Sequence, residues 1–467
     1  MVTLNELEKQ YVDTHKKSQK LYEQALEVLP GGVSHDSRFR KPFPIYARNA
    51  AGSKKWDVDG NEYVDLVMGH GALLFGYGEE KVVERLSEQV KEATHIGACS
   101  EYEIEWAKLI QQLIPSARNG LVRGTSCGTE AVAMGIRLSR AYTDKNRIII
   151  HLGAYHGKID TTIIARSGPP TKTYNVKGIP EGVMKDVAIV PFNNLQAVRK
   201  ELQAGDVACI LLHSNALYEQ EYIKGLRELS TEYDAVFFMD EVVSGCRYSA
   251  GGAQEYYGVT PDLTALGKII GGGVHVGAIC GNKDIMDYYS FKDENWNKYM
   301  RISVGGTWNC QPISIIGGIE MMKKINTEKD RIYPKIREIS KKLCKSFNEQ
   351  AEDLGVSVYA YGLPVGNPTT FSINLFNKMI PEKKKYLWKT GPRTFDEYKE
   401  KSSYRAESKS NQINYLSTIN DGIFSYGGLG GSISTAHTNQ DADKILKATE
   451  NSLRILKENK LIGGKHT

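Results

Sequence analysis

One lysine, Lys268, lies among apolar and glycine residues in the stretch TALGKIIGGG (264–273). Between Asp262 and Lys283 no other side chain is fully charged. An ammonium group in such surroundings loses hydration, so its pKa is expected to fall and the amine to become a better nucleophile. The alternative is a lysine that extends its charged head to water from an apolar stretch. The other motifs of the chain decide between these two interpretations.

Two turns of the chain combine glycine with small hydroxyl residues. The first, GTSCGTEAVAMGIRL (124–138), leads into a helix predicted to start near Glu130. Backbone amides at such a helix N-terminus form a site suited to phosphate, although many such turns only cap the helix. The second, VGGTWNCQP (304–312), also provides donors that can reach a phosphate. Both turns are therefore candidate phosphate-binding segments.

Aromatic and acidic side chains occur at the ends of two predicted strands. HLGAYHGKID (151–160) leads from a strand into a loop with Tyr155 and His156, where an aromatic ring either stacks on a planar ligand or simply packs. Asp240 ends the apolar strand in FFMDEVVSGCR (237–247), where a carboxylate is costly unless it faces a cation or a protonated nitrogen. Phosphate donors, an aromatic ring, a carboxylate and a desolvated lysine are the groups that pyridoxal 5′-phosphate chemistry uses. This combination favours the nucleophilic interpretation of Lys268.

The elements that must position these residues are strands that alternate with helices between about residues 70 and 320. Near-continuous apolar runs separated by helical stretches predict a mostly parallel sheet covered on both faces, with ligands at the carboxyl ends of the strands. The apolar runs are RIIIHL (147–152), VAIVPF (187–192), VACILLH (207–213), AVFFMDEV (235–242) and HVGAICG (275–281).

The two ends of the chain have different patterns. Residues 4–29 are predicted to form one helix, and residues 441–459 another. The stretch 54–66 alternates apolar and polar residues around an Asp-Gly pair, which predicts a β-hairpin. The Lys-rich stretch 378–411 is interpreted as a solvated insertion or mobile loop, with a functional basic patch as the alternative.

Composition excludes several classes of function. The chain has 467 residues and a net charge of +5 from 60 basic and 55 acidic residues, without a basic stripe typical of nucleic-acid binding. Its seven cysteines contain no CxxC pair, so neither a metal site nor a disulfide framework is expected. The common nucleotide-binding glycine motifs and HExxH are absent. Without a signal peptide or a long apolar run, a cytoplasmic protein with no membrane contact is expected.

The motifs, in this order, resemble those of the class-III aminotransferases, which are pyridoxal-phosphate enzymes of fold-type I. Within that family they are most similar to the glutamate-1-semialdehyde aminomutase subgroup and the related β-phenylalanine aminotransferases. The resemblance runs from about residue 22 to the end of the chain. Its motifs are LPGGV, WDVDGNEYVDL, CGTEA, AYHG, DEVVSG, PDLTALGKIIGGG, GGTWNCQP and STAHT.

The resemblance implies an α/β fold with a large domain, built on a mostly parallel sheet covered by helices, and a smaller α+β domain. Residues 1–65 would form an N-terminal helix and hairpin that belong to the small domain. Residues 66–325 would form the large cofactor-binding domain, and residues 326–467 the C-terminal part of the small domain.

The resemblance also assigns roles to single residues in the cofactor site. Lys268 would form the Schiff base and move protons, and Asp240 would pair with the pyridine nitrogen. The residues implied to contact the phosphate or the ring are Gly128, Thr129, Tyr155, His156 and Val242, with Tyr155 on one ring face and Val242 on the other.

Two further implications concern the partner subunit and the substrate. Thr307 would reach the phosphate bound by the neighbouring subunit, so a homodimer with shared active sites is expected. Arg38 would bind the substrate carboxylate, with Arg40 as its close competitor.

The chain departs from the family pattern at three places. Ser126-Cys127 replaces the usual Asn-Ser, and LLHSNALYEQEY (211–222) lacks the expected glutamate. The segment YGGLGGSISTAHT (426–438) has no acidic residue where the aminomutases carry one.

The predicted function is an aminotransferase that moves an amino group from an amino acid or primary amine to a 2-oxo acid or aldehyde. One alternative is a 1,2-aminomutase, or another isomerase, that uses the same cofactor. The other alternative is a non-catalytic binding or regulatory protein that keeps the fold.

Overall fold

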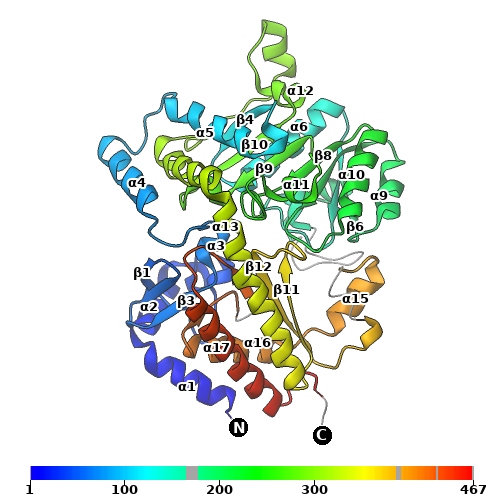
Figure 1. Cartoon of the computed structure of the whole chain (residues 1–467). Coiled ribbons are helices and arrows are strands. Elements are labelled where there is room, and N and C mark those ends of the chain that lie inside the picture. Colours follow the sequence, from blue (N-terminus) through cyan, green and yellow to red (C-terminus); the bar gives the residue numbers. More distant parts are fainter. Residues whose placement is uncertain (1, 165–176, 385–390, 428–429, 465–467) are drawn as a thin grey trace. The chain divides into compact units, whose positions relative to one another are not determined.

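The computed structural model describes residues 2–164, 177–384, 391–427 and 430–464 and divides into two compact units (Figure 1). The first unit comprises Met1–Glu79, Pro334–Trp388 and Glu400–Thr467. The second unit comprises Glu80–Tyr333 and Lys389–Lys399. The first unit therefore combines segments from both ends of the chain. The domain ranges expected from the sequence, 1–65, 66–325 and 326–467, remain a proposal.

The second unit is built on a seven-stranded sheet with the order β4-β10-β9-β8-β7-β5-β6. The pairs along β9-β8-β7-β5-β6 are parallel, and β10 alone runs antiparallel to both of its neighbours. The predicted α/β fold with a large, mostly parallel sheet is thus confirmed. Its strands are β4 (Leu121–Thr125), β5 (Arg147–His151), β6 (Val187–Val190), β7 (Val207–His213), β8 (Val236–Asp240), β9 (Leu263–Gly267) and β10 (Gly277–Gly281).

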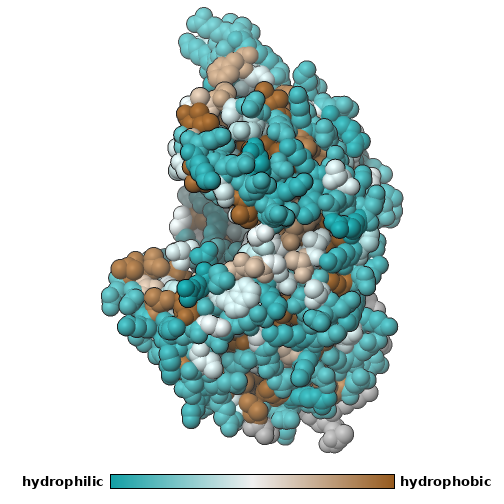
Figure 2. Space-filling model, turned by 60° about the vertical axis from the view of Figure 1, so that its left-hand side comes forward, coloured by the Kyte–Doolittle hydropathy of each residue, from teal (hydrophilic) through white to brown (hydrophobic). Residues whose placement is uncertain are grey.

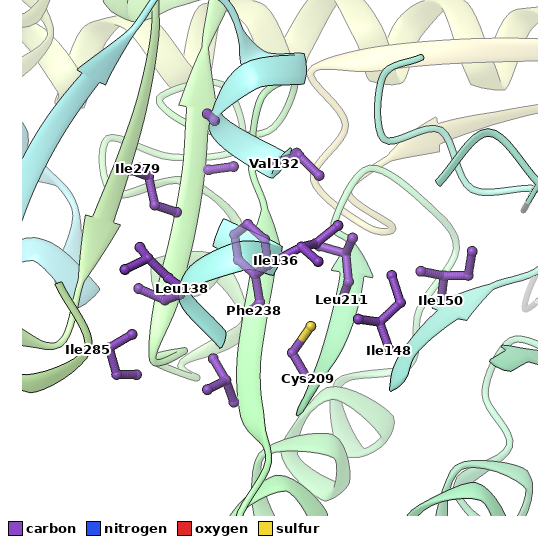
Figure 3. Close-up of a cluster of buried hydrophobic side chains, with 14 of the residues drawn as sticks. Val132, Ile136, Leu138, Ile148, Ile150, Cys209, Leu211, Phe238, Ile279 and Ile285 are labelled. Atoms are coloured by element: carbon purple, nitrogen blue, oxygen red, sulfur yellow. The ribbon is translucent and has the colours of Figure 1, made fainter. Parts of the chain in front are cut away.

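Helices cover this sheet, and the core lies between them and the strands. Helix α6 (Gly128–Thr143) presents Val132, Ile136 and Leu138 to side chains of the sheet (Figure 3). Every residue of β8 and β9 is buried, which explains their near-continuous apolar sequences. The other helical segments of this unit are α4 (Glu80–Glu92), α5 (Glu101–Leu113), η3 (Pro115–Ala117), α7 (Asp160–Ile163), α8 (Glu181–Lys185), α9 (Leu195–Leu202), α10 (Gln220–Glu232), α11 (Gly252–Tyr257), η5 (Lys268–Gly271), α12 (Lys283–Met286), η6 (Asp287–Tyr289) and η7 (Trp296–Met300).

The first unit contains two small sheets. One has the order β1-β2-β3-β13 and the other β11-β12-β14. The predicted hairpin is confirmed, because β2 and β3 pair antiparallel on either side of the Asp-Gly turn. The strands are β1 (Ala47–Ala51), β2 (Lys54–Asp57), β3 (Glu62–Asp65), β11 (Val358–Leu363), β12 (Thr370–Leu375), β13 (Ile423–Phe424) and β14 (Gly430–Ser432).

The longest helix of the described residues, α13 (Pro312–Asp353), begins in the second unit and ends in the first. The predicted C-terminal helix is confirmed as α17 (Asn439–Glu458). The remaining helical segments of the first unit are α1 (Leu4–Thr14), α2 (Lys16–Val28), η1 (Pro30–Gly32), η2 (Asp36–Arg38), α3 (Met68–Gly71), η8 (Glu382–Lys384) and α16 (Ser408–Asn420).

The prediction of one helix over residues 4–29 is wrong. The helix breaks at His15, whose backbone is not helical (φ −129°, ψ 41°). Asp59, from the hairpin turn, accepts hydrogen bonds from the backbone amides of Lys17 (2.7 Å) and Ser18 (3.0 Å). The first backbone amides of a helix have no hydrogen-bond acceptor within the helix. The bonds to Asp59 provide acceptors for such amides at the start of α2. The break therefore depends on a residue more than forty positions away, which local periodicity does not reveal.

The described part of the Lys-rich stretch 378–411 includes a helix, so it is not a loop throughout, and none of the residues of that helix is buried. Residues Phe395–Ser403 form helix α15. Arg393 makes an ion pair with Glu219, and its carbonyl accepts a hydrogen bond from Asn194 at 2.9 Å. The rest of the stretch includes residues 385–390, which lie outside the described residues.

The face shown in Figure 2 is mostly hydrophilic, with hydrophobic side chains in small separate patches. Among the described residues, no helix is long and apolar enough to cross a membrane.

The contact between α6 and the sheet generates the first prediction. A Cβ at Gly135 would lie 2.2 Å from Cζ of Phe238, so Gly135→Ala is expected to force this interface apart. Overpacking of this kind costs about 1–3 kcal/mol of the free energy of unfolding. The matched control is Gly182→Ala in α8, where a Cβ meets no atom within 4 Å. Denaturant unfolding should show destabilisation of the Gly135 variant only; equal stability of both variants would contradict the packing argument.

Candidate functional site

The carboxyl ends of the central strands bring the predicted cofactor residues together in the second unit. Asp240 ends β8 and is buried. Its Oδ2 lies 2.8 Å from Nδ1 of the buried His156, and its Oδ1 accepts a hydrogen bond from the backbone amide of Val242 at 3.0 Å. Two residues predicted from separate motifs are therefore direct partners.

The electrostatic balance keeps Asp240 ionised. Burial is the largest single effect and raises the pKa of Asp240, whereas the hydrogen bond with His156 lowers it. The charges of His156 and His213 and the amide of Val242 act in the same direction, so the pKa is lowered from its ordinary value. A buried carboxylate held in this way is a fixed negative charge.

Lys268 follows the last residue of β9 and begins η5. Its backbone lies in the left-handed region (φ 54°), which non-glycine residues seldom adopt and which is often found at functional sites. Burial lowers the pKa of Lys268, the charge of Asp240 raises it, and Arg247 lowers it; the net shift is downward. Within the described part of the chain, its amine makes no hydrogen bond and no ion pair. The lysine is therefore a desolvated amine and not a surface cation.

At several glycines the backbone passes so close to a neighbouring side chain of the site that a Cβ would not fit. A Cβ at Gly128 would lie 2.6 Å from both Cγ atoms of Val242, and one at Gly267 would lie 3.2 Å from Cγ1. Gly157 (φ +85°) approaches Thr129 so closely that a Cβ would lie 2.4 Å from Oγ1. These contacts place the start of α6, the loop after β5 and the end of β9 next to one another.

The first turn of α6 has no side-chain cap. Cys127 occupies the N-cap position and provides no side-chain hydrogen bond. One nearby amide is already used, because Ser126 N donates to Oε2 of Glu130 at 2.7 Å.

The second predicted phosphate turn also lies beside α6. Oγ of Ser126 donates to Oδ1 of Asn309 at 3.0 Å, which joins the turn 304–312 to the first one. Thr307 is exposed, and its carbonyl lies 2.8 Å from Nε2 of His95. Tyr155, predicted to stack on the ring, is 41% exposed.

Sequence reasoning missed two residues of this site. His213 ends β7 in register with Asp240, and its ring centroid lies 5.6 Å from that of His156 in an edge-to-face arrangement. The available signal in the sequence was that His213, like Asp240, stands at the end of a predicted apolar strand. Arg247 is fully buried and contributes to the low pKa of Lys268; it lies seven residues after Asp240, and no local pattern marks it.

Arg38 lies in the first unit, at the end of η2, and its side chain is exposed. Both Arg38 and Arg40 line a cavity of about 420 Å³ whose lining residues all belong to that unit. Arg40 donates to the carbonyl of Phe39 at 2.7 Å.

The described residues contain no group of three or more His, Cys, Asp or Glu side chains that could hold a metal ion.

The balance of charges around Lys268 yields a second prediction. Because the Asp240 charge raises the pKa of Lys268, Asp240→Asn is expected to lower that pKa further and to increase the neutral amine present at a given pH. In protein freed of bound small molecules, the midpoint of Lys268 acetylation against pH, followed by peptide mass spectrometry, should move to lower pH. Asp284→Asn, at the start of α12, is the control. An unchanged or higher midpoint for Asp240→Asn would show that its charge does not act on the amine.

Comparisons with known proteins agree with this arrangement. The family profile described as "Aminotransferase class-III" matches residues 36–360. A protein of Methanosphaera stadtmanae named glutamate-1-semialdehyde 2,1-aminomutase is 32% identical over 454 residues, which cover 94% of this chain and 99% of the relative. Its name favours the aminomutase alternative over the predicted aminotransferase.

Solved structures share the fold over nearly the whole chain. An omega-transaminase from Sphaerobacter thermophilus has a TM-score of 0.80 and 28% identity, covering 94% of this chain and 97% of that one. A transaminase described with PLP bound has a TM-score of 0.81 and 26% identity, covering 95% and 99%. The expected fold-type I architecture and the expected cofactor are confirmed. The chain belongs to the class-III aminotransferase family, and its cofactor is pyridoxal 5′-phosphate.

Proposed function

We propose that this protein is an enzyme of the 1,2-aminomutase type, which moves an amino group between adjacent carbons of one small carboxylic acid. The observation that carries this choice is the similarity to the relative named glutamate-1-semialdehyde 2,1-aminomutase, which spans 94% of the chain. The desolvated lysine and the buried carboxylate at the ends of β9 and β8 support cofactor chemistry and oppose a purely structural role.

The residues present fit the cofactor. Nε2 of His156 is buried and has no hydrogen-bond partner among the described residues, as expected for a polar atom beside a ligand. The N-terminus of α6, without a side-chain cap, offers the amides of Gly128 and Thr129 to a phosphate. Gly128 also lets Val242 approach at a distance that any side chain at this position would prevent.

Each chain residue then has a defined task in the proposed function. When bound, pyridoxal phosphate supplies an electrophilic carbon that accepts amines and a ring that withdraws electrons. The Lys268 amine would hold the cofactor through that carbon, and it would take and return a proton at the substrate. The fixed charge of Asp240 would favour a protonated ring nitrogen, and His156 would orient Asp240. Tyr155 and Val242 would hold the ring from its two faces.

The proposal extends to the substrate and to assembly. Arg38 binds the substrate carboxylate, for which a guanidinium fork is well suited. Thr307 is exposed, which suits a donor that serves the phosphate site of a second subunit in a homodimer.

Transfer between two molecules is the second candidate. Its specific support is that the two solved structures at 28% and 26% identity are named transaminases. The segment 426–438, which lacks an acidic residue, also departs from the aminomutase pattern implied by the resemblance. Both candidates use the same chain residues and differ only in whether a second substrate accepts the amino group.

The third prediction separates the two candidates. Purified enzyme is expected to convert glutamate-1-semialdehyde to its isomer over many turnovers without any added oxo acid. An aminotransferase would stop after one equivalent per site and resume when a 2-oxo acid or aldehyde is added. Chromatography of the products, with Lys268→Ala as the inactive control, makes the measurement. Turnover that depends on an added acceptor would reject the aminomutase proposal and favour the second candidate.

The fourth prediction concerns the covalent attachment. Borohydride treatment of the purified protein should fix the cofactor to the peptide that contains Lys268, as read by mass spectrometry. Lys268→Ala is expected to bind the cofactor through its phosphate and ring contacts but to lose turnover by many orders of magnitude, because both nucleophile and base are removed. A label found on Lys158 or Lys283 would refute the assignment.

A further inference from the structure

The ring of His156 is held unequally at its two nitrogens. Nδ1 lies 2.8 Å from Oδ2 of Asp240, whereas Nε2 is buried and has no hydrogen-bond partner among the described residues. The torsion that turns an imidazole about its bond to Cβ has broad, roughly two-fold minima. Half a turn would bring Cδ2, a carbon, to the place where Nδ1 faces the carboxylate. Packing around the ring must therefore help to keep this hydrogen bond in place.

The loop after β5 holds the backbone of His156 but does not act on the rotation of its ring. Oγ1 of Thr162 donates to the carbonyl of His156 at 3.4 Å. The next residue, Gly157, passes Thr129 so closely that a Cβ would lie 2.4 Å from Oγ1. These contacts fix where the side chain begins. The constraint on the ring has to come from a side chain of another element.

His213, the last residue of β7, is placed to supply that constraint. It is the cross-strand partner of Asp240 in the parallel pair of β7 and β8. Its ring centroid lies 5.6 Å from that of His156, with the two ring planes at 87°. This edge-to-face arrangement is favourable for planar rings, because the positive edge of one ring meets the negative face of the other. A ring packed in this way resists rotation of its neighbour.

The end of β7 is also tied firmly to Asp240. Ser214, which follows His213 and is fully buried, donates to the carbonyl of Asp240 from its amide at 3.2 Å and from its hydroxyl at 2.5 Å. The same hydroxyl lies 2.5 Å from Oγ of Ser244, which donates to Oε2 of the buried Glu241 at 3.0 Å. His213 therefore keeps a fixed position relative to the carboxylate.

We propose that His213 is a positioning residue, whose ring braces the imidazole of His156 and keeps Nδ1 of His156 on the carboxylate of Asp240. His213 acts through His156 and touches neither substrate nor cofactor. It belongs to the segment 211–222, one of the three places where the chain departs from the family pattern. The effect on the cofactor rests on the proposed function, in which Asp240 faces the cofactor ring, but the bracing itself does not.

The test follows the exchange of the C2 proton of His156 for deuterium in the full-length holoenzyme, read by mass spectrometry on a fragment without His151. This exchange is slow while the ring is buried and held, and it becomes faster when the ring turns. His213→Ala and His213→Leu both remove the bracing ring, and the leucine restores most of its volume. Each should speed the exchange at His156 about three- to tenfold, the scale of one edge-to-face ring pair. His213→Phe keeps a planar ring and should preserve the slow exchange.

Two controls separate bracing from a general loss of stability. Tyr142→Ala removes one ring of another edge-to-face pair in the same unit, that of Tyr142 and Tyr288 with centroids 6.3 Å apart, and should leave the exchange at His156 unchanged. His437, which is buried in the first unit, should exchange equally slowly in every variant. Thermal unfolding verifies that each variant is folded.

Slow exchange at His156 in the alanine or the leucine variant would overturn the proposal, because the ring of His213 would then not be needed. Fast exchange in the phenylalanine variant would also overturn it, because another property of His213 would then be responsible.

The absorption spectrum of the bound cofactor against pH separates this inference from the proposed function. The alanine and leucine variants of His213 should displace the spectrum in the same direction as Asp240→Asn does, and the phenylalanine variant should not. Faster exchange at His156 with an unmoved spectrum would refute the role of Asp240 in the proposed function and leave the bracing intact. Unchanged exchange with the cofactor label still on Lys268 would refute only the bracing.

Discussion

The site in the second unit depends on one buried charge, the carboxylate of Asp240. A carboxylate at the end of a strand buried on both faces is stable only if its lost hydration is replaced. His156 and the amide of Val242 provide hydrogen bonds, and Asp240 remains ionised. Because β8 is central in the sheet, this charge lies where the ends of the neighbouring strands converge. It is also the charge that opposes the desolvation of Lys268.

The rest of the local backbone is arranged around this charge. The loop after β5 must reach α6 for His156 to meet Asp240, and Gly157 permits that approach to Thr129. Val242 follows Asp240 and packs against Gly128, so the same short segment fixes both the carboxylate and the start of α6. Substitutions at these glycines would therefore be expected to move the charged residues as well as the backbone.

The first unit follows a different electrostatic principle. There a buried carboxylate, Asp65, is matched by Lys55, while two arginines of the cavity have no acidic partner in the described chain. One unit thus contains a lysine amine with a lowered pKa and a fixed negative charge, and the other presents two arginines without an acidic partner in the described chain.

The sequence by itself determined the alternation of strands and helices and the residues at the strand ends, and it singled out Lys268 as a candidate. Apolar runs and glycine turns are local properties, and a lysine without neighbouring acids is visible in the chain. For the same reason the hairpin at 54–66 and the C-terminal helix were predicted correctly.

Only the tertiary structure decided the contacts between distant segments. The break at His15 depends on Asp59, the second histidine at Asp240 depends on the pairing of β7 with β8, and the effect of Arg247 on Lys268 depends on packing. The cavity that joins Arg38 and Arg40 to Tyr415 and Phe424 combines residues nearly 400 positions apart. Hydrogen bonds, burial and charge interactions act through space, and neither spacing nor periodicity along the chain encodes which distant side chains will meet.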